Sequence, residues 1–361
     1  EIGTGDWSSD VCSSDLRDLY MGDCNYGPVC NYTDAHPQIS FIARTGERLT
    51  TPKMVYNYLS KRICKQEAAV KAASLFLFKH VNRLGKTRVS LFCGPTGSGK
   101  TYIWDVIRQN LFPHIIFVNS ANITRSGYTG PNITDNLLKI DPQSRWAPIF
   151  VFDEIDKMVQ PSYTSHNENI SQGVQSELLA LIQPSNDVMS IGSGQQNIKI
   201  NLKKCSWVFC GSFAIAAEDV AAKGKTSGLG FNAVKQTPVA YEEELTLQNL
   251  IDFGMIPELA GRINEIINLH PITLDGYKAA IKNQSASPIR QIEESFHLEH
   301  GYIRKHILKK SELDVITEAA FESGLGMRAI NSKIQERVSN YIFNNYEKIY
   351  ADHIDEYGSS L

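Results

Sequence analysis

One eight-residue segment limits the folds open to this chain more than any other part of its sequence. Residues 94 to 101 read Gly-Pro-Thr-Gly-Ser-Gly-Lys-Thr and match the pattern G-x-x-x-x-G-K-[ST]. The segment follows a short apolar run, Val89 to Cys93, and precedes a helical stretch, Lys100 to Asn110. With glycine near 7% of residues, a chance match occurs in about one chain per hundred of this length. The context predicts a strand, a phosphate loop (residues 94 to 101) and a helix.

The residue types of the phosphate loop suit a nucleoside triphosphate. Glycines let backbone N–H groups approach phosphate oxygens, and the helix start adds partial positive charge. Lys100 is expected to reach the β and γ phosphates, and the Thr101 hydroxyl to complete the shell of a Mg²⁺ ion. The candidate nucleotide-binding residues are Gly94, Pro95, Thr96, Gly97, Ser98, Gly99, Lys100 and Thr101.

A second motif follows the apolar run Ile149 to Phe152. The run ends in two adjacent carboxylates, Asp153 and Glu154. Asp153, with Thr101, is the candidate Mg²⁺ ligand, and Glu154 is placed to polarise the water that attacks the γ phosphate. A second carboxylate beside the metal-binding one favours hydrolysis over binding alone. The chain is therefore expected to hydrolyse a nucleoside triphosphate.

Short apolar runs alternate with helical stretches along the middle of the chain. The stretches Gln66 to Leu84 and Val174 to Ile182 are expected to be helices. The expected strands, besides Val89 to Cys93, are His114 to Asn119, Pro148 to Asp153, Trp207 to Cys210 and Glu265 to Leu269. This alternation predicts an α/β fold, with a parallel sheet covered by helices on both faces.

The sequence suggests four segments. Residues 1–16 look like translated adapter sequence and are expected to be non-native, and residues 17–50, without clear periodicity, are expected to be a poorly ordered N-terminal arm. Residues 51–270 are expected to form the large ATPase domain. Residues 271–361 are expected to form a small, mainly helical C-terminal domain, because Ile330, Ile334, Val338 and Ile342 lie four apart.

Composition narrows the class of protein. The net charge of -3 argues against broad capture of nucleic acid or of anionic membranes. No apolar run approaches the roughly 18 to 20 residues that span a bilayer. The seven cysteines contain no C-x-x-C pair, so neither a disulfide framework nor a zinc ribbon is indicated. A soluble, cytoplasmic protein is expected.

From about Thr51 to Phe343 the chain resembles the AAA+ ATPases and, within them, the ClpX unfoldases, without their zinc-binding N-terminal domain. The stretch Ser126-Gly127-Tyr128-Thr129-Gly130 resembles the aromatic pore loop of that family. The resemblance implies that Gly127, Tyr128, Thr129 and Gly130 contact substrate polypeptide in the channel of a ring. A tyrosine between glycines can grip many sequences, because a flexible hinge carries an amphipathic ring.

Further segments carry the resemblance. Residues 253–262 end in Arg262, which corresponds to the arginine finger offered to a neighbouring subunit's nucleotide. Residues 324–328 resemble the sensor-2 motif, in which Arg328 touches the phosphates from the small domain. Ser212, after the strand Trp207 to Cys210, is the sensor-1 candidate.

Two more segments resemble parts of the family that contact the adenine base and the partner peptidase. The family's Val-Ile-Gly-Gln box corresponds to Ile63-Cys64-Lys65-Gln66, with lysine replacing glycine, and Ile63 and Cys64 are the candidates for adenine contacts. Leu229, Gly230 and Phe231 resemble the loop with which ClpX docks onto the ClpP peptidase. Exposed apolar side chains on a polar loop suit burial by a partner.

The leading hypothesis is an ATP-dependent unfoldase that forms a homo-oligomeric ring, by resemblance a hexamer, and threads unfolded or tagged proteins to a ClpP-type peptidase. ATP and Mg²⁺ are the implied cofactors, and no intrinsic protease site is expected. An HslU-like unfoldase is one alternative, although only residues 155 to 211 separate the Asp-Glu pair from the sensor-1 candidate. An AAA+ nucleic-acid remodelling ATPase is another, but no helix-turn-helix or strongly basic domain is evident. A non-catalytic nucleotide-binding scaffold is the third.

Overall fold

The computed structural model describes residues 41–84, 88–124, 131–140, 144, 146–163, 167–186, 188–191, 198–224, 244–283, 287–324 and 326–357. The strands are β1 (Phe41–Ile42), β2 (Arg48–Leu49), β3 (Val89–Cys93), β4 (Ile115–Asn119), β5 (Ile149–Asp153), β6 (Met189–Ile191), β7 (Ile198–Ile200), β8 (Ser206–Gly211) and β9 (Glu265–Asn268). The α-helices are α2 (Pro52–Ser60), α3 (Glu67–Val81), α4 (Lys100–Asn110), α5 (Ile155–Val159), α6 (Ile170–Ile182), α7 (Ala214–Gly224), α8 (Leu247–Phe253), α9 (Pro257–Ala260), α10 (Leu274–Lys282), α11 (Pro288–Ser295), α12 (Lys310–Glu322) and α13 (Met327–Tyr357). Shorter helical turns are η1 (Ser120–Asn122), η2 (Ile133–Lys139), η4 (Leu202–Lys204) and the π-helical η5 (Ile303–Ile307).

The central sheet has five parallel strands in the order β4-β5-β8-β3-β9. All five were expected from the sequence, and their bounds agree within one residue. Because parallel strands point the same way, their carboxyl ends share one edge of the sheet. There Cys93 lies opposite Gly211, and Asn119 lies opposite Asp153. The segments that follow β3, β5 and β8 therefore begin side by side.

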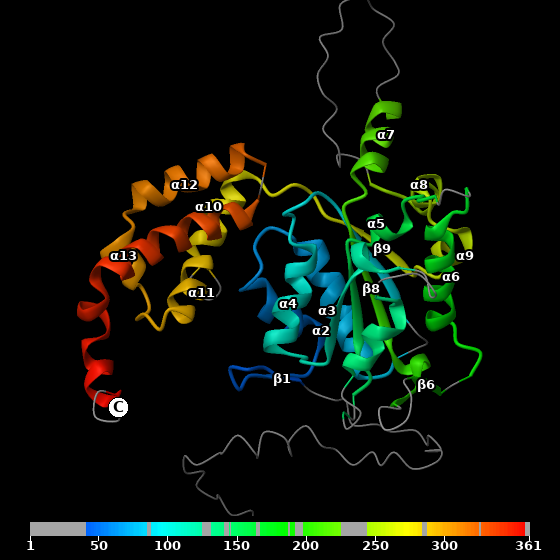
Figure 1. The fold of residues 1–361 in the computed structure, drawn as a ribbon, viewed down its shortest axis with the longest axis horizontal. Helices are drawn as coiled ribbons and strands as arrows, with labels where there is room; N and C mark the ends of the chain where they lie inside the picture. The colour runs from blue at the N-terminus through cyan, green and yellow to red at the C-terminus, as the bar shows by residue number, and fades with distance from the viewer. Residues whose placement is uncertain are drawn as a thin grey trace, which may run out of the picture.

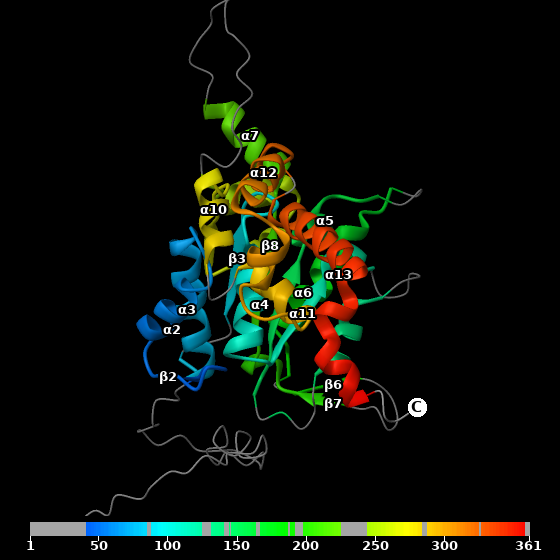
Figure 2. The ribbon, with the colours of Figure 1, turned by 90° about the vertical axis from the view of Figure 1, so that its left-hand side faces the viewer.

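Helices cover both faces of the sheet (Figures 1 and 2). α2, α3 and α4 bury one apolar cluster against one face, and α5, α6, α7, α8 and α9 bury a second cluster against the other. Side chains alternate along each strand, so Leu91 and Cys93 join the second cluster while Phe92 joins the first. The expected α/β fold with a covered parallel sheet is confirmed.

The C-terminal helical region, α10 to α13 with η5, lies beside the sheet and has its own apolar cluster (Figure 1). Ile330, Ile334 and Val338 on α13 are fully buried in it, and Ile342 packs against it. This confirms the helix that their four-residue spacing predicts. Although α13 has 31 residues, no helix in the described part of the chain is long and apolar enough to cross a membrane.

The expectation of a poorly ordered arm over residues 17–50 is wrong for its last ten residues. β1 and β2 form an antiparallel pair, and Phe41 and Leu49 are buried against the α2 and α3 side of the sheet. Two-residue strands are too short to show an alternating pattern, so the sequence gives no local signal for them. Residues 1–40 lie outside the described residues.

Candidate active site

The phosphate loop passes so close to β9 that one of its positions admits only glycine. Gly94 has φ of 152°, and a Cβ built on it would lie 2.4 Å from the carbonyl oxygen of Leu269. A side chain there would collide with backbone that cannot move aside. The loop that the motif predicts is thus fixed at the carboxyl edge of the sheet, between the end of β3 and the first turn of α4.

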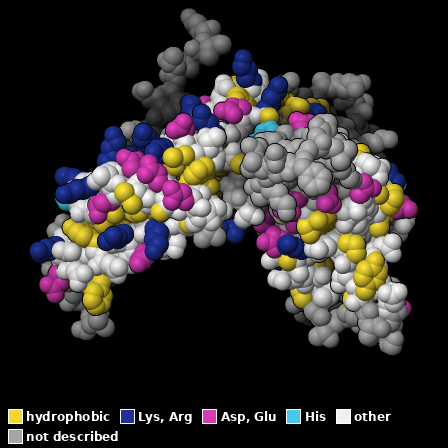
Figure 3. Space-filling model, turned by 90° about the horizontal axis from the view of Figure 1, so that it is seen from above, with side chains coloured by type: hydrophobic (Ala, Val, Ile, Leu, Met, Phe, Trp, Pro, Cys, Tyr) yellow, Lys and Arg dark blue, Asp and Glu magenta, His cyan; other side chains and the backbone are white. Residues whose placement is uncertain are grey.

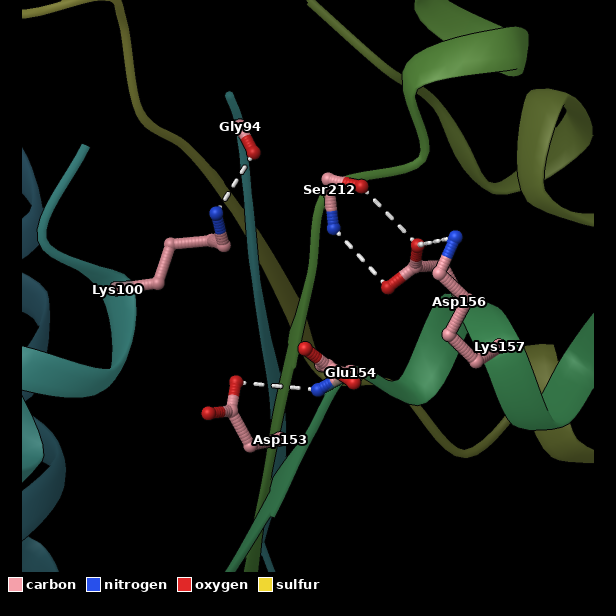
Figure 4. A network of polar contacts seen from close by, with 7 residues as sticks. All are labelled: Gly94, Lys100, Asp153, Glu154, Asp156, Lys157 and Ser212. Atoms are coloured by element: carbon pink, nitrogen blue, oxygen red, sulfur yellow. Dashed lines mark hydrogen bonds and ion pairs between the residues drawn. The ribbon is translucent and has the colours of Figure 1, made fainter. Parts of the chain in front are cut away.

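Lys100 and Ser98 supply polar groups inside this loop. The Lys100 side chain is largely buried, and its Nζ donates hydrogen bonds to the carbonyl oxygens of Gly94 and Pro95, each at 2.8 Å. Figure 4 shows the bond to Gly94. Burial lowers the pKa of Lys100. The Ser98 hydroxyl is buried and has no hydrogen-bond partner among the described residues. A buried cation beside an unpaired buried hydroxyl suits an anion such as phosphate.

Asp153 and Glu154 lie beside the start of α4. The Thr101 hydroxyl donates to Asp153 Oδ1 at 2.8 Å. The Glu154 backbone N–H donates to the same oxygen at 3.0 Å, as Figure 4 shows. Glu154 has φ of 56°, a left-handed conformation that non-glycine residues rarely adopt. This backbone turn leaves the Glu154 side chain exposed at the cleft wall.

Ser212 follows β8 and is held by Asp156, which is almost fully buried. The backbone N–H of Ser212 donates to Asp156 Oδ1 at 3.1 Å, and its hydroxyl donates to Asp156 Oδ2 at 3.0 Å (Figure 4). The sequence analysis missed Asp156, although it stands only two positions after Glu154. The carboxylate fixes the end of β8 beside the helix that follows Glu154.

The C-terminal helical region supplies the second wall of the cleft. One cleft of about 940 Å³ is lined by Ile63 and Cys64, by Ser98 to Thr101, by Asp153, Glu154 and Ser212, and by Met327 and Arg328 of α13. Seen from above (Figure 3), an indentation separates the part of the surface that α12 and α13 form from the part around the sheet.

Lys65 and Gln66 directly follow Ile63 and Cys64, which line the cleft. Lys65, which replaces the family's glycine, adopts the left-handed conformation with φ of 62°. The buried Gln66 amide donates to the carbonyl oxygen of Ser98 at 3.0 Å and to that of His270 at 2.9 Å. Gln66 thus ties the phosphate loop to the segment that leads into the C-terminal helical region.

Comparison with known proteins agrees with this geometry. Residues 90–203 match the family model described as "ATPase family associated with various cellular activities (AAA)". The protein named "ATP-dependent Clp protease ATP-binding subunit ClpX" from Treponema denticola is 26% identical over 347 residues, which cover 87% of this chain and 81% of that protein. The chain is similar to ClpX over most of its length and contains an AAA ATPase domain. Proteins of the same name from Borrelia duttonii and Borrelia recurrentis are 26% identical over 328 residues, 82% of this chain and 74% of theirs.

These findings confirm the predicted family resemblance, the fold class and the ATPase activity. The cleft brings together all of the expected nucleotide-site residues except three. Arg262 is exposed beyond α9 and does not line the cleft. Gly94 and Pro95 contribute the carbonyl oxygens that hold Lys100 rather than cleft surface. The expected pore loop, Gly127 to Gly130, and the expected docking loop, Leu229 to Phe231, lie outside the described residues.

The donor set also fits a bound Mg²⁺ ion. Among the described residues no group of three or more His, Cys, Asp or Glu side chains could hold a metal. Mg²⁺ in nucleotide sites needs only one or two carboxylates, because phosphates and water complete its shell. The carboxylate of Asp153 and the hydroxyl of Thr101 meet that requirement.

Proposed function

We propose that this chain is the ATP-hydrolysing unfoldase subunit of a Clp-type protease and works as a homohexameric ring. One observation carries the proposal: a single cleft in which the phosphate loop, Glu154 and Ser212 face Arg328 of the C-terminal helical region. A protein that only binds a nucleotide does not need a second cleft wall supplied by a separate helical region. The relatives named as ATP-binding subunits of a Clp protease support this direction.

Hydrolysis uses the residues around the phosphate loop. Lys100 leaves the carbonyl oxygens of Gly94 and Pro95 and binds the β and γ phosphates of ATP. Asp153 and Thr101 hold Mg²⁺, which supplies positive charge to those phosphates when bound. Glu154 orients the attacking water and accepts its proton.

Arg262 acts on a neighbouring subunit. Its side chain is exposed, it does not line the cleft of its own chain, and it forms no ion pair with a described residue. A guanidinium that is free to meet another surface suits the charge that develops on the γ phosphate. Each active site is then complete only within the ring.

The hydrolytic step moves two domains, residues 51–270 and 271–361, relative to each other. Arg328 contacts the phosphates from α13, so ATP and ADP favour different angles between the domains. Tyr128, in the segment Gly127 to Gly130 that resembles the family's pore-loop motif, pulls the substrate polypeptide through the central channel as the large domain moves. Leu229, Gly230 and Phe231 dock the ring onto a ClpP-type peptidase, which receives the unfolded chain.

The test is ATP-dependent unfolding of a tagged fluorescent protein by the wild-type protein and three variants. Glu154→Gln should bind ATP but hydrolyse it about 100-fold more slowly and unfold nothing. Tyr128→Ala should hydrolyse ATP and unfold little, whereas Tyr163→Ala, the same change at an exposed tyrosine, should behave as wild type. Normal unfolding by Tyr128→Ala contradicts the gripping role. ATP turnover that is stimulated by DNA or RNA, with no unfolding, favours a nucleic-acid remodeller instead.

A further inference from the structure

Gln175 is a fully buried amide that lies outside the nucleotide cleft. It stands in the middle of α6 on the side of the sheet opposite α4, and its exposed fraction is 0%. A buried glutamine is stable only if both ends of its amide are paired. The partners of Gln175 are all backbone groups, and they belong to two different segments.

The first segment is the helix that follows the Asp153–Glu154 pair. Gln175 Nε2 lies 3.4 Å from the carbonyl oxygen of Val159, the last residue of α5. α5 begins at Ile155, directly after Glu154, and its five residues rise by about 7 Å. The amide of Gln175 is therefore one short, rigid helix away from the residue that is proposed to activate water.

The second segment leads to Arg262. Gln175 Nε2 donates to the carbonyl oxygen of Gly254 at 3.0 Å, and its Oε1 accepts from the backbone N–H of Ile256 at 2.8 Å. Ile256 is the N-cap residue of α9, and its own side chain gives no capping hydrogen bond. Gln175 thus fixes the start of a four-residue helix whose end, at Gly261, directly precedes Arg262.

The two segments are also in direct steric contact. Gly254 has φ of 130°, and a Cβ built on it would lie 2.8 Å from the carbonyl oxygen of Val159. The end of α5 and the turn before α9 therefore cannot shift independently, and Gln175 hydrogen-bonds to both. Met255 and Leu259 add apolar contacts on the same side of the sheet.

We propose that Gln175 is a positioning residue for Arg262: its amide links the helix after Glu154 to the segment that presents Arg262 to the neighbouring subunit. A conformational change at Glu154 in one subunit is then transmitted to Arg262, which serves the active site of the next subunit. This inference rests on the proposed role of Arg262 in trans.

The test uses mixed rings, because a residue that acts through Arg262 must change turnover in the neighbour. Donor subunits carry Glu154→Gln, so they supply a finger but hydrolyse little ATP themselves. They are mixed with wild-type subunits at about five to one, and ATP turnover per wild-type subunit is measured. About one neighbour in six is then wild type, so loss of the donor finger lowers this turnover by at most about sixfold.

Donors with Glu154→Gln and Gln175→Met should lower turnover almost as far as donors with Glu154→Gln and Arg262→Ala. Donors with Gln172→Met, the same change at an exposed position one turn earlier on α6, should match the parent donor. Equal turnover with and without Gln175→Met overturns the inference. Equal turnover with and without Arg262→Ala instead overturns the proposed finger, so the two failures are distinguishable.

A second variant covers the case in which Gln175→Met prevents folding. Gln175→Glu keeps an acceptor for the Ile256 N–H, but it can donate at most one hydrogen bond, to the carbonyl oxygen of either Gly254 or Val159, and none when ionised. Its incorporation into rings is checked by sedimentation. Incorporated Gln175→Glu donors should give an intermediate loss of turnover, and turnover equal to that of the parent donor contradicts the positioning role.

Discussion

Gly97 of the phosphate loop and Gly326, one residue before α13, lie backbone against backbone. A Cβ built on Gly97 would be 3.2 Å from the Cα of Gly326, and one built on Gly326 would be 3.1 Å from the Cα of Gly97. Both residues have positive φ, 80° and 73°. The phosphate loop therefore touches the C-terminal helical region directly, next to Arg328, without an intervening side chain.

This contact can be tested by adding one methyl group. Gly326→Ala should raise the KM for ATP by about 10-fold, because the methyl group forces α13 and Arg328 away from the loop. Gly324→Ala is the matched control: its φ is 67°, but nothing lies within 4 Å of its Cβ position. Its KM should stay within about twofold of wild type, since it shares the backbone strain and lacks the contact. Equal KM values for the two variants would contradict the interpretation.

The hydrogen bonds between Asp156 and Ser212 predict coupled kinetic effects. Asp156→Asn and Ser212→Ala should each lower kcat by about 10-fold with little change in KM, because either change frees the end of β8 beside Glu154. The double variant should be no slower than either single variant, because the effects of substitutions within one hydrogen-bond network are not additive. If kcat of the double variant in the steady-state ATPase assay falls by the product of the two single falls, the two residues act separately.

Cys64 provides a probe of the proposed adenine position. It is half-buried at the cleft wall, whereas burial raises the pKa of the Cys93 thiol to about 12 and also raises the pKa values of Cys205 and Cys210. A maleimide should therefore modify Cys64 faster than these three. ATP should slow modification of the Cys64 peptide, measured by mass spectrometry, by about 10-fold at saturation. Unchanged labelling with ATP bound would place the base elsewhere.

His80 predicts an acid-dependent loss of stability. Burial is the main cause that lowers its pKa from 6.5 to about 4, and its ring contacts the Ser206 hydroxyl and the carbonyl oxygen of Ala147. Below pH 6.5 the unfolded chain binds a proton that the folded chain resists, so stability falls as pH drops from about 6.5 to about 4. The expected loss is about 3 kcal/mol. The free energy of unfolding of His80→Gln, measured with urea, should not show this fall between pH 6.5 and about 4. The same fall in the variant would contradict the assignment to His80.

The sequence predicts the sheet and the phosphate loop well because both depend on local patterns. Continuous apolar runs mark β3, β4, β5, β8 and β9, and the glycines and lysine of the loop are adjacent in the chain. Gln66 and Gln175 could not be found in this way, since their partners lie 204 residues away at His270 and about 80 residues away at Gly254 and Ile256. Only the folded chain brings these groups together.

The shortest elements were also beyond local prediction. The β1–β2 pair is held by burial and by contacts with distant residues rather than by periodicity. The same holds for Asp156, whose position after Glu154 looks like an ordinary helix-start carboxylate until β8 is placed beside it.

The most direct test of the account is whether purified wild-type protein, without a peptidase, removes the fluorescence of a tagged fluorescent protein in the presence of ATP. We predict a loss of fluorescence with ATP and none with a non-hydrolysable ATP analogue or with the Glu154→Gln variant. If assembled rings bind the tagged protein and hydrolyse ATP steadily, but its fluorescence does not fall, the claim that this chain converts hydrolysis into protein unfolding is contradicted.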